Sequence, residues 1–195
     1  MVFHHQLLII TRPIQKIIRQ IGCKLGFINP NRLRVLLYHD IPVEEEDSLY
    51  KQLIWLKQDW NFISPLQFEK MILGEIPIEG NNLLITFDDG MFSNLAVAEK
   101  ILNKLGIKAI FFVINEFIKI KDPFEARKFA SKYLIPGSNV NDIPMTWKNL
   151  QWEDLEELIK QGHTIGHHTK MHTRLSNCCS QNDLEDEIIK KTLIK

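Results

Sequence analysis

The sequence predicts an α/β fold with a mostly parallel sheet, because short apolar runs alternate with amphipathic helical segments along its 195 residues. Two of the apolar runs lead into groups of polar side chains. Residues 83–89 end in two aspartates, and residues 163–172 contain four histidines. In parallel α/β folds, functional sites form at the carboxyl ends of the strands. We therefore expect the two groups to lie at the same edge of the sheet.

The N-terminal part of the predicted fold is a strand followed by two helices. Residues 34–42 are largely apolar before they reach a polar end, which predicts a buried strand. Residues 48–60 place Leu49, Leu53, Leu56 and Trp60 at helical spacing. The second helix has Ser64 at its cap position, Pro65 at its first position and Gly74 as a stop signal.

The remaining pattern continues the alternation of strands and helices. The expected segments are a strand at 82–89, a helix at 91–105 before Gly106, a strand at 108–114, a helix at 124–133, a helix within 146–162 and a strand beginning at 163. In the helix within 146–162, Leu155, Leu158 and Ile159 are expected to face the core. A last helix at 182–195 is expected to turn Leu184, Ile188, Ile189 and Leu193 inward.

The overall composition is that of a globular protein. Hydrophobic residues make up 45% and charged residues 25% of the chain, and the formal net charge is zero. Nothing global therefore favours a nucleic-acid partner. The three cysteines show no paired framework, which favours a reducing compartment.

Positive charge is concentrated at the N-terminus. Six basic residues precede the first acidic residue, Asp40; they are Arg12, Lys16, Arg19, Lys24, Arg32 and Arg34. Residues 1–33 are interpreted as a basic, helical arm, which either contacts an anionic membrane surface or is simply solvated. No apolar run is long enough to be a membrane span or a signal-peptide core. A cytoplasmic or peripheral location is the default expectation.

Asp88 and Asp89 follow a buried strand directly, although adjacent carboxylates repel each other and burial strengthens the repulsion. A turn or helix cap would explain one aspartate better than two. A metal site explains both, because one carboxylate can ligate a cation while the other accepts a proton from water. Gly90 would supply the tight turn and open the next helix, whose N-terminus would also offset the negative charge.

The histidines supply further metal ligands. His168 and His172 are four residues apart, and on a helical turn this spacing would place both imidazoles on one face. Two histidines and one carboxylate form a recurrent catalytic zinc set, and open-sided versions bind iron or cobalt. His163 is expected to lie apart from the site, and His167 is expected to pack behind it. His39 either contacts substrate or is a hydrogen-bonded structural residue.

With these motifs in view, the chain resembles the polysaccharide deacetylases, also described as the NodB homology domain or carbohydrate esterase family four. The resemblance rests on "TFDDG" and "GHTIGHHTKMH", supported by "VLLYHDIP", "LGIKAIFFVINEFI" and "MTWKNLQWEDLEELIKQGHTIGHHT". It covers roughly residues 34–195. It implies a distorted (β/α) barrel and metal-dependent removal of acetyl groups from N-acetylated or O-acetylated carbohydrate.

The resemblance also implies roles for individual residues. Asp88 matches the general base of the family, and Asp89, His168 and His172 match its metal ligands. The implied cofactor is a divalent metal, zinc first, with cobalt, nickel or iron as alternatives. The implied partner is an acetylated polysaccharide or oligosaccharide, and the family often acts outside the cytoplasm.

The chain also departs from the family pattern. The later motifs, including a histidine that protonates the leaving amine, are not recognisable. Residues 34–195 are accordingly expected to hold a partial barrel that lacks its C-terminal part, and two alternatives to an active deacetylase stay open. One is an inactive truncated remnant that binds metal or glycan, and the other is a metallohydrolase of small cytosolic amides.

Overall fold

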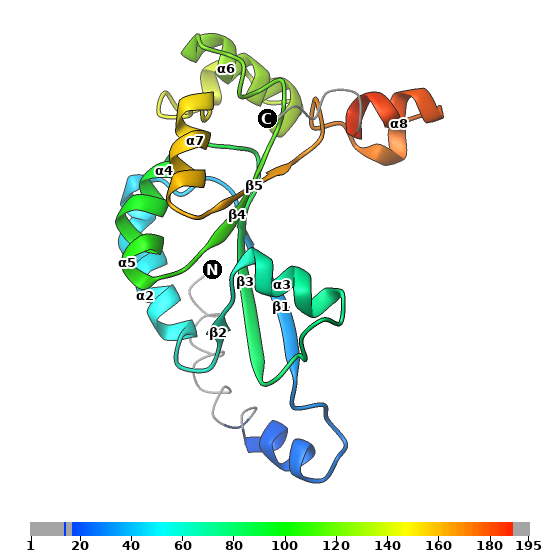
Figure 1. Ribbon diagram of the computed structural model, residues 1–195. Helices are drawn as coiled ribbons and strands as arrows, with labels where there is room; N and C mark the ends of the chain where they lie inside the picture. Colours follow the sequence, from blue (N-terminus) through cyan, green and yellow to red (C-terminus); the bar gives the residue numbers. More distant parts are fainter. Residues whose placement is uncertain (1–13, 15–16, 189–195) are drawn as a thin grey trace.

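The computed structural model describes residue 14 and residues 17–188. Its sheet consists of β1 (Arg32–Tyr38), β2 (Asn61–Phe62), β3 (Asn81–Phe87), β4 (Ala109–Val113) and β5 (Thr164–His167). The strand order is β1-β3-β4-β5, with β2 beside the start of β3, and every pair of strands is parallel (Figure 1). The predicted α/β class and parallel sheet are confirmed. The sheet formed by the described residues is open, with β1 and β5 at its two ends.

Apart from β2, which was not predicted, the strands and the helices that connect them follow the predicted order. The α-helices are α2 (Glu46–Leu56), α3 (Pro65–Ile72), α4 (Ser93–Val97), α5 (Asn103–Leu105), α6 (Pro123–Phe129), α7 (Trp152–Lys160) and α8 (Gln181–Ile188). Two π-helical segments, η2 (Ala98–Leu102) and η3 (Ala130–Leu134), join α4 to α5 and prolong α6; short 3-10 turns are η1 (Val43–Glu45), η4 (Val140–Asp142) and η5 (Leu175–Asn177). Residues 17–24 are also helical. Among the described helices, none is both long and apolar enough to cross a membrane.

The predicted helix signals act as expected at two boundaries. The Ser64 side chain accepts a hydrogen bond from the Gln67 backbone, the Gln67 side chain bonds back to Ser64, and Pro65 begins α3. This reciprocal capping satisfies amide groups that a helix start otherwise leaves unpaired. After α5, Gly106 adopts a left-handed conformation with φ 69°, which ends the helix.

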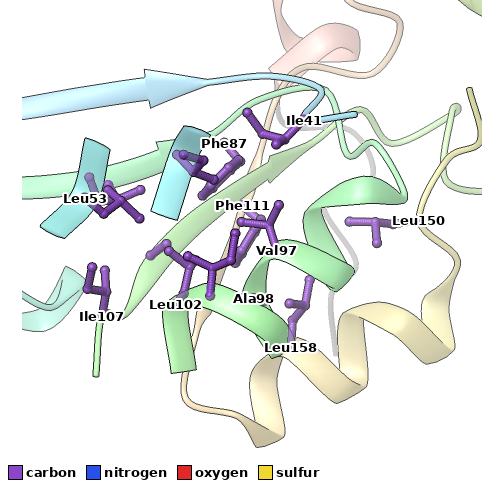
Figure 2. Packing of buried hydrophobic residues seen from close by; sticks show 14 of the residues in the cluster. Ile41, Leu53, Phe87, Val97, Ala98, Leu102, Ile107, Phe111, Leu150 and Leu158 are labelled. Atoms are coloured by element: carbon purple, nitrogen blue, oxygen red, sulfur yellow. The ribbon is translucent and has the colours of Figure 1, made fainter. Parts of the chain in front are cut away.

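The main core lies between one face of the sheet and helices α2, α4, α5 and α7 (Figures 1 and 2). Phe87 of β3 and Phe111 of β4 form its centre, with their rings stacked at 5.0 Å. Leu53, Leu102 and Leu158 join the same cluster from three helices, and all are fully buried (Figure 2). The strands that carry the aspartates and histidines are thus fixed by apolar packing on this face.

The packing differs from the sequence expectation in three places. The strand at 34–42 is only partly buried, because β1 is an end strand whose Val35 and Leu37 side chains are nearly half exposed. Ile159 of α7 is also 47% exposed, although Leu155 and Leu158 face the core as predicted. In β1 the alternate residues Leu36 and Tyr38 pack against the main core, so Val35 and Leu37 point away from it.

The last helix was also expected to bury an apolar face. In α8, however, Leu184 and Ile188 are 36% and 42% exposed, and the helix projects from the carboxyl end of the sheet (Figure 1). Its described contacts with the chain after β5 are polar, because the Glu187 side chain accepts hydrogen bonds there. Ile189 and Leu193 lie outside the described residues.

His163 is a core residue. The residue is 4% exposed, its ring is edge-on to Phe111, and its Nδ1 accepts a hydrogen bond from the Ala109 amide at 3.2 Å. Burial, with a smaller contribution from Lys108, lowers the pKa of His163 to about 4. The imidazole is therefore neutral in the folded protein at neutral pH, which agrees with its predicted place apart from the site.

The pKa of His163 predicts an acid-sensitive stability. Between pH 6.5 and pH 4 the unfolded chain binds a proton on His163 that the folded chain does not, so the free energy of unfolding falls as the pH falls. At about 1.4 kcal/mol per pKa unit, the loss is on the order of 3 kcal/mol. Urea unfolding at several pH values should show a shallower dependence for His163→Gln than for the wild type. Identical dependences would contradict the assignment.

Candidate metal centre

Asp88 and Asp89 enter the same space although they are adjacent in sequence. The Asp88 amide donates to the Tyr38 carbonyl at 2.9 Å, which extends the pairing of β3 with β1. The next two residues, Asp89 and Gly90, both have left-handed conformations, with φ 74° and 76°. Side chains alternate in a regular strand, and this double left-handed turn ends the alternation. Gly90 was expected to make this turn alone. Asp89 shares it, because aspartate is a residue type that tolerates the left-handed conformation.

Gly90 is required by space as well as by backbone angle. A Cβ atom on it would lie 3.1 Å from Val113 Cγ1, so the turn passes close against β4. The following helix was expected to open directly after Gly90, but it begins at Ser93. The intervening Phe92 donates to the Lys148 carbonyl, and the Gly90 carbonyl accepts from the Leu150 amide.

His168 and His172 lie on a loop and not on a helical turn, so the predicted local structure was wrong. His168 directly follows β5, and its amide still donates to the Val113 carbonyl of β4 at 2.9 Å. Thr169 and His172 then both take a φ of 62°. These left-handed residues fold the loop back, which brings the two imidazoles together, with ring centroids 5.2 Å apart.

Asp89, His168 and His172 form what we call the ligand trio. His168 Nε2 and His172 Nε2 each lie 3.5 Å from Asp89 Oδ1. One ligand atom of each residue lies within 4.8 Å of the other two. Asp89 Oδ1 is buried and has no hydrogen-bond partner. A buried carboxylate oxygen without a partner is costly, and two imidazole nitrogens facing it form a donor set that suits a divalent transition metal.

The orientation of His172 is fixed from behind. Its Nδ1 lies 2.9 Å from the Tyr133 carbonyl oxygen in η3. A carbonyl can only accept a hydrogen bond, so Nδ1 carries the proton. The lone pair of Nε2 then faces Asp89 Oδ1. Metal-binding histidines are commonly oriented in this way by a carbonyl or carboxylate. The sequence contains no signal for this contact, because any residue at position 133 would present the same carbonyl.

Asp88 lies beside the ligand trio without belonging to it. Its Oδ2 is 3.9 Å from His168 Nε2, and the residue is 8% exposed. Burial is the main cause that raises the pKa of Asp88; His168 and His39 oppose the shift. A raised pKa makes a carboxylate a better proton acceptor. The geometry therefore distinguishes the two carboxylates: Asp89 faces both imidazoles, and Asp88 lies beside His168 alone.

Other polar groups near the site form hydrogen bonds between the segments that surround it. The His39 carbonyl accepts from the Asn94 side chain at 2.9 Å, and the Ser93 hydroxyl donates to Asp40 Oδ1 at 2.6 Å. Both contacts tie the end of β1 to the start of α4. His167 is the last residue of β5, and burial lowers its pKa; its packing behind the site stays a prediction.

The comparison with protein families gives a match to the polysaccharide deacetylase family over residues 77–193, which is more than half of the chain. YxkH of Bacillus subtilis (strain 168), which is assigned by name to the same family, is 25% identical over 173 residues. That alignment covers 84% of this chain and 52% of YxkH, so the chain spans about half the length of this relative.

Solved structures share the fold. IcaB from Ammonifex degensii is 27% identical, with a TM-score of 0.55 over 71% of this chain and 53% of IcaB. The Streptococcus pyogenes deacetylase PplD, solved with acetate, is 21% identical, with a TM-score of 0.58 over 82% of this chain and 66% of PplD. The likeness to PplD supports the fold alone, which is the (β/α) barrel type of the family. From the match over residues 77–193, this chain belongs to the polysaccharide deacetylase family.

Proposed function

We propose that the chain carries the metal-binding part of a deacetylase site. The reaction of that site is the hydrolysis of acetyl groups on N-acetylated or O-acetylated carbohydrate. The observation that carries the proposal is the partnerless, buried Asp89 Oδ1 with His168 Nε2 and His172 Nε2 both 3.5 Å away. The membership of the family supports the reaction class. The acetylated-glycan substrate follows from the same membership and is part of the proposal.

Asp89, His168 and His172 would hold the cation, and zinc suits a set of two histidines and one carboxylate best. Cobalt, nickel and iron accept the same donors. A bound divalent cation supplies Lewis-acid chemistry, which polarises an acyl carbonyl and lowers the pKa of water. It would also offset the repulsion between the two adjacent, buried aspartates.

Asp88 would act as the general base. Its carboxylate lies next to the ligand trio, and its raised pKa suits it to accept a proton from the attacking water. The position of Tyr133, whose carbonyl holds the Nδ1 proton of His172, keeps the lone pair of His172 Nε2 available for the cation. Asp88 and the ligand trio therefore have different roles, although Asp88 and Asp89 are neighbours in sequence.

We also propose that the N-terminal segment, whose described part includes a helix at residues 17–24 (the N-terminal helix), contacts an anionic membrane surface. In the described part of this segment, one apolar group is largely exposed; its members are Ile14, Ile17, Ile18, Ile21, Leu25 and Phe27, with exposed fractions from 53% to 83%. Their spacing places the aliphatic members on one side of a helix. No acidic residue occurs before Asp40, so the basic residues of this segment match anionic lipid headgroups in charge.

Metal binding tests the ligand trio without any assumption about substrate. The purified chain should bind zinc or cobalt tightly at one equivalent, and a variant with His168→Ala and His172→Ala should lose that binding. The reason is that these two imidazoles supply two of the three donors. Isothermal titration and cobalt absorption would measure it. Equal binding by the wild type and the variant would exclude the proposed centre.

Acetate release separates the roles of the two aspartates. Asp88→Asn should keep the metal and lower acetate release from chitooligosaccharide or poly-N-acetylglucosamine by about 10²–10⁴-fold, the usual contribution of a general base. Asp89→Asn, the matched control, should lose both metal and acetate release.

The same assay distinguishes the alternatives. A wild-type chain that binds metal but releases no acetate would be an inactive remnant. Hydrolysis of small N-acyl amides but not of glycans would indicate a different metallohydrolase. Full activity of Asp88→Asn would remove Asp88 from the role of base.

Sedimentation with lipid vesicles tests the proposed membrane contact. The full chain should bind vesicles of phosphatidylcholine mixed with phosphatidylglycerol, and high salt should weaken the binding, because salt screens surface charge. A variant with Ile18→Glu and Ile21→Glu should bind less. The matched control, Ile72→Glu with Leu73→Glu, changes exposed apolar residues outside this helix and should bind as the wild type. Equal binding of all three proteins would contradict the contact.

A further inference from the structure

The loop that carries both histidines of the ligand trio has a conformation that needs support. Thr169 and His172 are left-handed, and this conformation is strained for a β-branched residue such as threonine. Strain of this kind persists where surrounding contacts hold the backbone in place. The contacts that hold residues 168–173 therefore decide whether the two imidazoles stay together.

One side of this loop is held by the backbone that follows β4. The Asn115 amide donates to the Thr169 carbonyl at 3.2 Å, and the Glu116 amide donates to the Lys170 carbonyl at 3.0 Å. These bonds continue the pairing of β4 with β5 beyond the end of the sheet. They fix the loop up to Lys170, but they do not reach His172.

The other side is held by one carboxylate, that of Glu187 in α8. Glu187 Oε2 accepts from the amides of Lys170 and Met171 at 3.1 and 3.0 Å. Glu187 Oε1 accepts from the Thr173 hydroxyl at 2.8 Å. The Lys170 amide also lies 3.0 Å from the Glu187 backbone carbonyl. The carboxylate thus bonds to the residues on both sides of His172.

Hydrogen bonds to an ionised carboxylate are stronger than those between neutral groups. Three of them converge on Glu187, from a stretch of only four residues. The neighbouring Asp186 differs, since its carboxylate contacts the Lys170 ammonium at 2.6 Å and lies on the surface. Substitution of each acid in turn therefore compares the loss of hydrogen bonds to the loop backbone, at Glu187, with the loss of an exposed ion pair, at Asp186.

We infer that Glu187 is a positioning residue that holds the loop of His168 and His172 in the shape that binds the metal. Glu187 does not contact the ligand trio itself; it acts through Lys170, Met171 and Thr173. The inference rests on the metal-dependent function proposed above.

Metal affinity is the first test. Glu187→Ala should weaken zinc and cobalt binding by about 10–100-fold, as the loss of outer contacts commonly does. Glu187→Gln keeps one acceptor oxygen and should fall between Glu187→Ala and the wild type. Asp186→Ala, the matched control, should change the affinity by less than about fivefold, because exposed ion pairs contribute little. Equal effects of Glu187→Ala and Asp186→Ala would overturn the inference.

Amide hydrogen exchange of the metal-free chain provides a readout that does not depend on metal binding. The Met171 amide is the best probe, because its hydrogen bond is to the Glu187 side chain. Its exchange should be faster in Glu187→Ala and unchanged in Asp186→Ala, and Glu187→Gln serves if the alanine variant does not fold. Unchanged exchange in the folded Glu187 variants would overturn the inference. Faster exchange in a chain that binds no metal would refute only the proposed metal function.

Discussion

The site depends on joining two strands that are not neighbours. β4 lies between β3 and β5, so their ends are separated by about 10 Å at the usual strand spacing of about 4.8 Å. The atoms of the ligand trio nevertheless lie within 4.8 Å of one another. The backbone closes the gap with left-handed turns at Asp89 and Thr169, and Gly90 passes against Val113 of β4. These left-handed conformations cost free energy that other contacts must offset.

The electrostatics of the site also require compensation. Asp88 and Asp89 are both buried, and Asp89 Oδ1 has no hydrogen-bond partner. Burial raises the pKa of Asp88, which reduces the cost by favouring its neutral form. A cation held by the ligand trio would stabilise the ionised forms instead. The arrangement is unfavourable as a purely structural feature and reasonable as a binding site, because the interaction energy with the ligand offsets the cost of assembling it.

Parallel topology separates the two ends of the molecule. The ligand trio and α8 lie at the carboxyl ends of the strands, whereas the helix at residues 17–24 precedes β1 at the amino end (Figure 1). β1 has seven residues and is about 20 Å long. A membrane contact through the N-terminal helix would therefore leave the carboxyl edge of the sheet free. The contacts from η3 and α8 complete the site from segments outside the sheet.

The sequence by itself determined the α/β class, the order of the helices and of all strands except the two-residue β2, and the helix signals at Ser64 and Gly106, because these depend on local propensity and on apolar periodicity. It also identified the two polar groups that the sheet brings to one edge. Only the tertiary structure decided the exposed face of β1 and the loop conformation of His168 and His172, because both depend on neighbours distant in sequence. The contacts of Tyr133 and Glu187 with the histidine loop were likewise decided only by the tertiary structure. A backbone carbonyl and a single surface-helix carboxylate have no sequence pattern, and their roles arise only when folding places them beside the histidine loop.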